Sequence, residues 1–410
     1  MSKLDELIAE LCPEGVEYIP LKAIAQIGTG SSDRINASED GEYPFYVRSK
    51  TILRSHIYLF DEEAIIIPGE GGIGEIFHYV NGKYDLHQRA YRIHFVDERV
   101  NTKYGYYYLG GHFKKFITMK AVNATVTSIR KPMIENFRIP VPPLPVQQEI
   151  VRILDNFIEL TTELTTELTA RQKQYEYYRD KLLSFKGVIA DGQTSKLGKL
   201  IAELCPEGVE YKTLQDITKA VNIGINPRKF FKLNPEGAKG FYVTVRELNG
   251  LQGVKQCDKT DLIDLDAVKI INDRANIEIG DILFSNTGTV GKMALVTEPP
   301  NNWGVNEGIY VIKPKNEIIE SKFLYYFLSG KEAYNDYSSK FTGSTLKHIT
   351  QAALLSLPIP VPPLPVQQEI VRILDNFTEL IAELTTELEA RQKQYEYYRN
   401  KLLSFKEATA

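Results

Sequence analysis

The chain has 410 residues, of which 43% are hydrophobic and 25% are charged, as is ordinary for a soluble globular protein. This length predicts two or more domains, each large enough for its own core. A net charge of −4 and a pI near 6.0 do not by themselves indicate a nucleic-acid-binding protein. The sequence has no apolar run of the ~20 residues that span a membrane, and its acidic amphipathic start is unlike a signal peptide. We therefore expect a cytoplasmic protein without membrane contact.

The first segment of the chain occurs twice. The stretch LIAELCPEGVEY occupies residues 7–18 and returns, letter for letter, at residues 200–211. Its cysteines, Cys12 and Cys205, and the third cysteine, Cys257, show neither CxxC nor Cys/His spacing, and the six histidines are scattered without metal-ligand spacing. We therefore expect the cysteines to be small packing residues, and we expect no metal site.

A glycine turn between two short strands is expected in each of the two regions that differ between the repeats. Residues 64–67 and 76–80 flank the turn PGEGGIGE, and residues 281–284 and 293–296 flank the turn SNTGTVGK. The first turn has G-x-G-x-x-G spacing, but a strand follows it instead of a helix, which argues against dinucleotide binding. A glycine turn with polar tips can enter a DNA groove, because glycine allows close backbone approach. An ordinary hairpin is the alternative.

A second pair of matching segments follows further along. NATVTSIR at residues 123–130 aligns with GSTLKHIT at residues 343–350, at an offset of 220 residues. Thr, Ser, Lys, Arg and His at such positions suit contacts with phosphates and base edges. Upstream of them lie the aromatic segments 103–111 and 322–330, which have apolar residues on all sides. We expect these two segments to be core helices rather than platforms for base stacking.

The longest repeat is residues 139–186, which returns at residues 359–406 with changes at five places. Each copy opens with prolines, which force extended backbone and are tolerated at the first turn of a helix. From Val146 to Lys186 nothing breaks a helix, which at ~1.5 Å per residue would be about 60 Å long. Such a length, used twice, is typical of a spacer.

Apolar residues on this predicted helix follow the 3,4 spacing of a coiled-coil seam, beginning at Ile150 and continuing through Phe157 and Leu160. Leu164 and Leu168 then follow at two consecutive spacings of four, within tandem TTEL units. Two such spacings predict a stutter, a local unwinding of the supercoil.

The sequence contains no motif that indicates an enzyme. GxxxxGK[ST], HExxH, GxSxG and the Asn/Asp-Pro-Pro-aromatic signature of amino-methyltransferases are all missing. Basic residues do cluster within 101–138 and 212–246, and a DNA-binding protein needs to be basic only on its contacting face. These clusters permit DNA contact, with a solvated positive face as the alternative.

The order of segments resembles the specificity subunit of type I restriction-modification systems. The residues that carry this resemblance are the IPVPPLPxQQEIVRILD start of each helix, its RQKQYEYYRxKLLSF end, and the two differing regions, so the likeness covers essentially the whole chain. It implies an α+β fold in which two mixed α/β target recognition domains are separated by two long antiparallel coiled-coil helices, with pseudo-two-fold duplication. The implied domains are a first target recognition domain at 1–138, a central spacer helix with its proline-rich start at 139–186, a linker at 187–199, a second target recognition domain at 200–358, and a C-terminal spacer helix at 359–410.

The resemblance also implies a function. In that family each target recognition domain reads one half of a bipartite, asymmetric site on double-stranded DNA, and the chain itself is not catalytic. The spacer helices set the gap and dock two adenine-N6 methyltransferase subunits, and motor-nuclease subunits can join. S-adenosylmethionine, ATP and Mg belong to those partners, so no cofactor is expected in this chain. An orphan DNA-binding protein and a structural coiled-coil scaffold without DNA specificity are the alternatives.

Residues expected to contact DNA, or to shape the turns that do, are basic, polar or glycine. In the first domain they are Arg48, Lys50, Gly72, Gly74, Thr125, Thr127 and Arg130. In the second they are Arg228, Lys229, Asn286, Thr287, Gly288, Thr289, Gly291, Lys292, Thr345 and Lys347. The methyltransferase is expected to dock on helix faces that are the same in both copies, namely Tyr175, Tyr178, Leu182, Tyr395, Tyr398 and Leu402.

Overall fold

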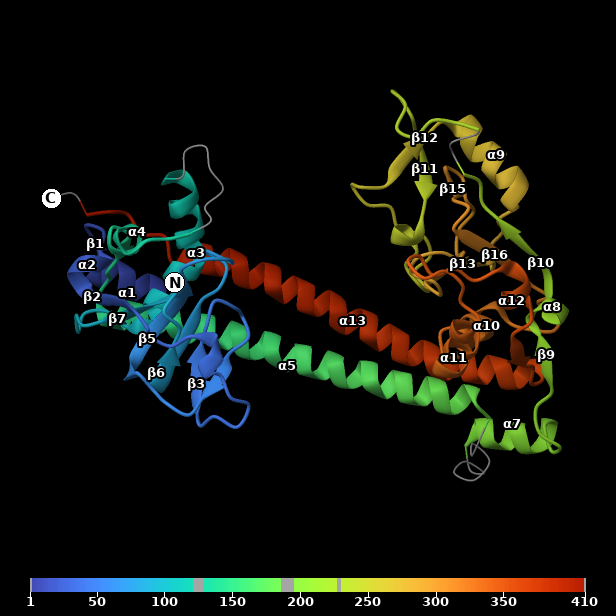
Figure 1. Cartoon of the computed structure of the whole chain (residues 1–410), viewed down its shortest axis with the longest axis horizontal. Coiled ribbons are helices and arrows are strands. Elements are labelled where there is room, and N and C mark those ends of the chain that lie inside the picture. The colour runs from blue at the N-terminus through green and yellow to red at the C-terminus, as the bar shows by residue number, and fades with distance from the viewer. Residues whose placement is uncertain (1, 121–127, 186–194, 227–229, 409–410) are drawn as a thin grey trace. The chain divides into compact units, whose positions relative to one another are not determined.

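The computed structural model in Figure 1 describes residues 2–120, 128–185, 195–226 and 230–408. The chain forms two compact units. Unit 1 comprises Met1–Thr166 and Thr386–Ala410, and unit 2 comprises Glu167–Thr385. Each unit therefore combines one globular part with a segment from each of the two long helices.

Unit 1 is built on a six-stranded sheet. The strands of unit 1, including the separate pair β1 and β8, are β1 (Tyr18–Pro20), β2 (Ala25–Thr29), β3 (Tyr43–Tyr46), β4 (Leu53–Ser55), β5 (Phe60–Pro68), β6 (His78–Leu86), β7 (Ala90–Phe95) and β8 (Arg138–Pro140). Its shorter helices are α1 (Lys3–Leu11), α2 (Leu21–Ile24), η1 (Arg34–Asn36), α3 (Thr102–Lys120) and α4 (Lys131–Glu135). The sheet order is β2-β7-β5-β6-β3-β4, and β1 pairs separately with β8. Ile65 and Ile93 of the sheet pack in one core with Tyr104 and Phe113 of α3.

Unit 2 is built on a four-stranded and a three-stranded sheet. Its strands are β9 (Tyr211–Thr213), β10 (Thr218–Ile223), β11 (Gly240–Val243), β12 (Asp261–Ile263), β13 (Ile282–Ser285), β14 (Met293–Leu295), β15 (Trp303–Val305), β16 (Ile309–Pro314) and β17 (Pro358–Pro360). Its shorter helices are α7 (Lys196–Leu204), α8 (Leu214–Ile217), η3 (Val245–Glu247), α9 (Leu265–Ala275), α10 (Ser321–Leu328), α11 (Lys331–Ser339) and α12 (Gln351–Leu355). The sheets run β10-β16-β13-β14 and β12-β11-β15, and β9 pairs with β17.

The two units share a common arrangement of strands. The order β2-β7-β5-β6 in unit 1 matches β10-β16-β13-β14 in unit 2, and all of these neighbours are antiparallel. The expected strands on either side of each glycine turn are present as β5 and β6, and as β13 and β14. The expected core helices are present as α3 and α10, where Tyr104 and Phe323 are fully buried.

Two long helices begin directly after the proline-rich segments. They are α5 (Leu144–Leu183, 40 residues) and α13 (Leu364–Leu402, 39 residues). In unit 1 the ring of Phe157 on α5 stacks on Tyr398 of α13, with centroids 5.5 Å apart. In unit 2 Tyr178 and Phe377 make the matching stack at 5.5 Å. Within each unit, the start of one helix therefore lies against the end of the other.

The seam of α5 follows a regular rhythm, which corrects the predicted stutter. Leu160 is 46% exposed and lies outside the seam. Its neighbour Thr161 is half-buried instead, and its hydroxyl donates a hydrogen bond to the Phe157 carbonyl at 3.0 Å. Between 157 and 171 the less exposed positions alternate by four and three: 157, 161, 164, 168 and 171. The prediction was wrong because a threonine whose hydroxyl is satisfied by its own helix can occupy a half-buried position.

Candidate nucleic-acid interface

In unit 2 the glycine turn and the segment before the second proline-rich stretch lie side by side. Thr287 and His348 form a β-bridge, and the Thr287 hydroxyl lies 2.9 Å from His348 Nδ1. The amide of Gly288 donates to the carbonyl of Lys347 at 2.8 Å. Two polar segments that are about 60 residues apart in the sequence therefore form one surface.

Unit 1 repeats this arrangement with different side chains. Glu70 and Ser128 form the corresponding bridge, and the amide of Ile129 donates to the Gly69 carbonyl at 2.8 Å. We call these paired segments the polar edge of each unit: residues 69–76 with 128–130 in unit 1, and 286–292 with 342–349 in unit 2. The described residues of the segments that the sequence analysis had matched by offset thus lie beside the glycine turn in both units.

Glycine is required at several positions of the polar edges. Gly72 and Gly74 have φ of +61° and +70°, and Gly288 and Gly291 have φ of +76° and +89°. These left-handed conformations are strained for residues with a Cβ. A Cβ on Gly74 would also stand 2.8 Å from the Cα of Lys114. These four glycines therefore set the backbone path of both turns, as the sequence analysis expected.

Arg48 of unit 1 lies beside the polar edge and is held there by an acid. Its Nη1 is 2.9 Å from Oε2 of Glu70, and Nη1 of Arg89 approaches the same oxygen at 3.2 Å. Arg48 and Glu70 line a hollow of about 550 Å³, together with Arg34 and His87. Burial lowers the pKa of His87, so its ring is neutral at pH 7. The arginines therefore supply the positive charge of this hollow.

The other predicted contacts of unit 1 are exposed or lie outside the described residues. Lys50 and Arg130 are exposed, and Arg130 precedes the first turn of α4. Hydrogen bonding to Lys114, and secondly its charge, lower the pKa of the Glu75 carboxyl, and the charge of Lys50 adds to this effect. The predicted contacts outside the described residues are Thr125 and Thr127 here, and Arg228 and Lys229 in unit 2.

The predicted contacts of unit 2 divide into buried and exposed residues. Asn286 is only 1% exposed, and its amide donates to the Glu307 carbonyl at 3.1 Å. Its Oδ1 accepts a hydrogen bond from the Thr287 hydroxyl at 2.7 Å. Asn286 therefore positions the edge instead of presenting its amide, which corrects the expectation that it reaches a base. The exposed members of the predicted set are Thr289, Lys292, Thr345 and Lys347.

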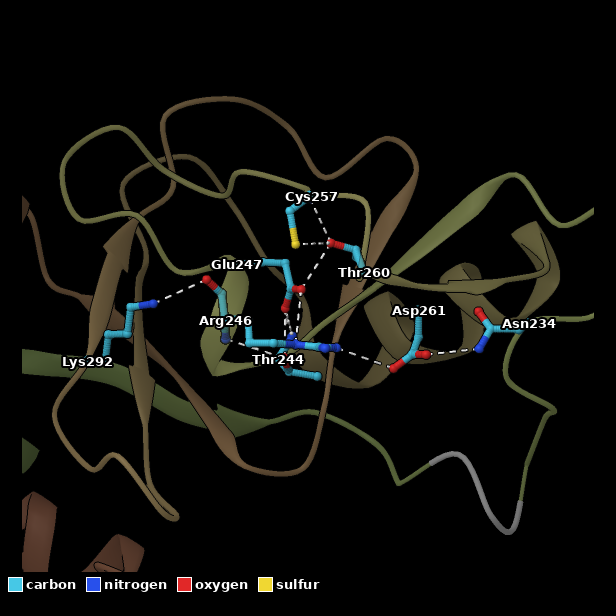
Figure 2. Close-up of polar contacts among 8 residues, drawn as sticks. All are labelled: Asn234, Thr244, Arg246, Glu247, Cys257, Thr260, Asp261 and Lys292. Carbon is cyan, nitrogen blue, oxygen red and sulfur yellow. Dashed lines mark hydrogen bonds and ion pairs between the residues drawn. The ribbon is translucent and has the colours of Figure 1, made fainter. Parts of the chain in front are cut away.

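Figure 2 shows a basic residue that the sequence analysis did not select. The Lys292 amine donates to the carbonyl oxygen of Arg246 at 3.2 Å, and the Arg246 guanidinium points toward Asp261. A signal for Arg246 was present in the sequence. The letters FYV precede Arg48 at residues 45–47 and recur at residues 241–243, shortly before Arg246.

The loop that carries Arg246 is fixed by a buried carboxylate. Glu247 is 1% exposed and accepts hydrogen bonds from the amide and the hydroxyl of Thr244, at 2.8 and 2.7 Å. The Thr260 hydroxyl also donates to Glu247 at 3.0 Å. Thr260 contacts Cys257 as well, and its hydroxyl lowers the pKa of that exposed thiol. These hydrogen bonds fix the loop that carries Arg246.

The residues expected to dock a partner are mostly used inside each unit. Tyr175, Leu182, Tyr395 and Leu402 pack against the hydrophobic cores, and Tyr178 and Tyr398 make the ring stacks between the long helices. Much of the surface of this set is therefore unavailable to a second protein. The tyrosines that remain most exposed on the same helices are Tyr177 at 60% and Tyr397 at 61%.

Metal-binding and membrane-spanning features are both missing from the described parts of the chain. Among these residues, no group of three or more His, Cys, Asp or Glu side chains is placed to hold a metal ion. No described helix combines the length and the apolar character needed to cross a membrane.

The fold and the polar edges define a two-unit protein in which similar sheets present different side chains. The family model described as the type I restriction modification DNA specificity domain matches residues 13–173 and 206–391. The chain therefore belongs to the type I restriction-modification specificity family, as its sequence resemblance indicated.

Individual relatives agree with this assignment. The chain is 30% identical over 408 residues to a Haemophilus influenzae chain described as a type I restriction enzyme specificity subunit, covering 95% of this chain and 96% of that one. It is 32% identical over 331 residues to the specificity subunit of two Escherichia coli type I restriction enzymes, covering 75% and 72%. The crystal structure of a type I restriction-modification S subunit from M. genitalium has the same fold, with a TM-score of 0.57 at 17% identity, over 95% of this chain and 96% of that one.

Proposed function

We propose that this chain is the DNA sequence-specificity subunit of a type I restriction-modification complex, and that each unit reads one half of a bipartite, asymmetric site on double-stranded DNA. The observation that carries this proposal is the pair of polar edges. They occupy equivalent places in equivalent sheets, yet one bridge joins Glu70 to Ser128 and the other joins Thr287 to His348. Equivalent edges with different hydrogen-bonding groups suit two different half-sites.

The two long helices have the properties of a spacer in this proposal. Their sequences are nearly the same, and within each unit the start of one lies against the end of the other. We propose that they pair antiparallel over their whole length, with pseudo-two-fold symmetry, and fix the gap between half-sites. A duplicated frame presents similar faces to two copies of one partner. We assign these faces to two adenine-N6 methyltransferase subunits, with Tyr177 and Tyr397 as matching contacts.

The chain contributes recognition and not chemistry in this assignment. Methyl transfer would use S-adenosylmethionine in the methyltransferase subunits, and cleavage would use ATP and Mg in motor-nuclease subunits that join the complex. Supporting this division, the sequence lacks the motifs of these activities, while its relatives are described as specificity subunits.

The test is adenine-methylome sequencing of a methylation-free host that carries the partner methyltransferase, with and without this chain. We expect one bipartite N6-methyladenine motif that appears only when the chain is present. A stable complex without any new motif would contradict the reading of DNA by this chain. Absence of both complex and motif would favour a coiled-coil scaffold.

The spacer assignment has its own test, based on the length of the helices. Insertion of one TTEL unit after Leu168, with a matched unit after Leu388, adds ~6 Å to each helix and rotates the remainder of that helix by about 40°. Matching both insertions keeps the two helices in register with each other, although each helix then carries one four-residue stutter. We expect a longer gap in the methylated motif and unchanged half-sites. A changed half-site with an unchanged gap would contradict the assignment.

The single insertion after Leu168 is the informative companion. It leaves α13 at its native length, so the paired seams fall out of register beyond the insertion. We expect this variant to methylate less than the matched double insertion, with the same half-sites.

A further inference from the structure

We propose that Arg48 and Arg246 are equivalent base-reading residues, one for each half-site, and that each recognises the guanine of a G·C pair. This inference rests on the proposed function and identifies the residues that determine specificity within it. Each arginine is oriented by carboxylates beside it, which act as positioning residues.

The equivalence is first a matter of strand pairing. Arg48 follows β3 and Arg246 follows β11, and both strands lie between one antiparallel and one parallel neighbour. Phe45 of β3 is opposite Leu53 on its antiparallel side, and Phe241 of β11 is opposite Leu262. The shared FYV letters thus have the same pattern of strand pairing in both units, although β3 belongs to the six-stranded sheet and β11 to the separate three-stranded sheet. An arginine follows the C-terminal end of each strand.

In unit 1 the guanidinium of Arg48 is held beside the polar edge. Glu70, which bonds it at 2.9 Å, belongs to the edge itself through its bridge to Ser128. The Arg48 side chain remains 44% exposed and faces the hollow of about 550 Å³. On the same hollow, a Cβ placed on Gly71 would meet no atom within 4 Å, so the approach is open. A ligand can therefore reach Arg48 without displacing the backbone.

In unit 2 the guanidinium of Arg246 lies between two carboxylates (Figure 2). Its Nη2 is 3.5 Å from Oδ2 of Asp261, and its Nε is 3.6 Å from Oε1 of Glu247. Asp261 is in turn bonded by the Asn234 amide at 2.9 Å. Arg246 remains 46% exposed, close to the exposed fraction of Arg48, and Lys292 of the polar edge bonds its carbonyl. Both units therefore present one tethered, half-exposed arginine next to the edge.

The carboxylates favour a base edge over a phosphate as the target. A carboxylate 2.9 to 3.6 Å from an arginine, as beside Arg48 and Arg246, repels an approaching phosphate and cancels much of the attraction between the arginine and that phosphate. The O6 and N7 atoms of guanine are neutral acceptors, so the same carboxylate does not oppose them. It also holds the planar guanidinium in one orientation, as two-pronged recognition of guanine requires. Acid-tethered arginines at a DNA edge are thus suited to guanine.

The experiment compares methylated motifs for Arg48→Ala and Arg246→Ala in the methylation-free host that carries the partner methyltransferase. We expect Arg48→Ala to lower the preference for G·C at one position of one half-site by about 5- to 150-fold. Arg246→Ala should do the same at one position of the other half-site, so each variant is the control for the other. Arg99→Ala, which removes an exposed arginine paired with Asp97 away from the edge, should leave the motif unchanged.

The positioning carboxylates are tested by Glu70→Gln and Asp261→Asn. Both variants should lower the preference for G·C at the same half-site positions as the arginine variants, but by a smaller factor. Glu70→Asp should restore part of that preference. A purely structural role would lower thermal stability without changing base preference. Should an alanine variant not fold, Arg48→Lys and Arg246→Lys keep the charge but lose the planar fork, and are expected to lose preference for guanine while retaining affinity.

The possible failures are distinguishable. A wild-type motif that contains no G·C pair dependent on Arg48 or Arg246 would overturn this inference and leave the proposed function intact. Affinity that falls equally for all sequences, with a salt slope reduced by about 1, would identify phosphate contacts and also overturn it. Absence of any chain-dependent motif for the wild type would instead remove the proposed function.

Discussion

The contacts that anchor each long helix to its globular part, the supports, are alike in the two units, whereas the polar edges are not. Gln147 at the start of α5 is fully buried, and its amide donates to the carbonyls of Arg99 and Pro142 at 2.7 and 2.6 Å. Its Oε1 accepts from the amide of Asn101 at 2.8 Å. Gln367 at the start of α13 is equally buried and makes the same three kinds of bond, at 2.7 to 2.9 Å. One glutamine thus fastens each long helix to its own globular part.

The polar edges differ at the places that correspond. In unit 1 the bridge carries Glu70, which binds two arginines, and in unit 2 it carries Thr287, which bonds the imidazole of His348. A buried, fully bonded glutamine is costly to replace, while an exposed edge residue usually changes stability little. This difference would allow one frame to hold the two proposed readers of unlike sequence preference.

The largest effect, a loss of stability, is expected when the glutamine of either support is replaced. Gln147→Ala or Gln367→Ala leaves a buried amide and two carbonyls without their partner, at a cost of about 3 kcal/mol of unfolding free energy. Because the bonding is repeated, the two variants should cost the same, each in its own unit. Hydrogen exchange in urea, resolved by unit, measures both losses. Gln172→Ala, at an exposed glutamine of α5, is the control and should change little. Unequal losses of stability would mean that the two supports are not equivalent.

A smaller effect is expected at the helix faces that we propose as docking sites for the methyltransferase. Replacing both Tyr177 and Tyr397 with Ala removes two large exposed rings and should cost about 2 kcal/mol of methyltransferase affinity for each site. Replacing both with Phe keeps the rings and should retain most of the affinity. Calorimetric titration of the methyltransferase subunit measures both variants. Single variants should leave one full-strength site each, and any inequality between them would show that the two faces are not equivalent.

The common frame of this chain could be predicted from sequence because its signals are local. Apolar runs on either side of glycine turns gave strands, and uninterrupted periodicity after prolines gave the two long helices. The coiled-coil seam was less accessible. Whether Leu160 or Thr161 enters it depends on the partner helix and on the bond of Thr161 to the Phe157 carbonyl, neither of which the periodicity reveals.

The polar edges could be predicted only in outline. Their glycines and exposed lysines were identifiable, since left-handed turns require glycine and turn lysines are usually exposed. The burial of Asn286 depends on the carbonyl of Glu307, which lies about 20 residues later and carries no sequence signal. Arg246 was missed because Thr244 and Val245 separate it from FYV, whereas Arg48 follows FYV directly, so the two arginines do not align by simple offset.

A pH titration provides a finer comparison of the supports. Glu149 is bonded by Arg152 and Lys3, which lower its pKa from 4.5 to about 2, with Arg152 as the main cause. Glu369 has the same low pKa of about 2 through Arg372 and Lys196. Each carboxylate therefore stabilises the folded state above pH 4.5, and this stabilisation is lost as the pH falls toward 2.

The size of this pH effect is modest because the basic partners of both carboxylates are exposed. We expect about 1 kcal/mol for each unit. Unfolding of Glu149→Gln and Glu369→Gln, followed from pH 5 to pH 3, should show equal flattening of the pH dependence. A pH dependence that disappears with only one of the two variants would mean that the supports differ after all.

The smallest effect is expected at Lys292, the residue of the polar edge whose amine contacts Arg246. Its amine rests on the Arg246 carbonyl at 3.2 Å and forms no ion pair with a carboxylate among the described residues, so unlike Arg246 it attracts phosphate freely. Lys292→Ala should weaken DNA binding by less than about tenfold at low salt and reduce the salt slope by about 1, with the methylated motif unchanged.

The contrast with Arg246→Ala makes this last result decisive. Both side chains belong to the same corner of unit 2, but a loss of affinity shared by all sequences marks a phosphate contact, and a loss of preference at one base pair marks a base contact. Fluorescence anisotropy across a salt series, on cognate and single-substituted duplexes, separates the two. A changed base preference for Lys292→Ala would make Lys292 a reader, and unchanged affinity at every salt concentration would remove it from the interface. Either result would contradict the assignment of Lys292 as a phosphate contact.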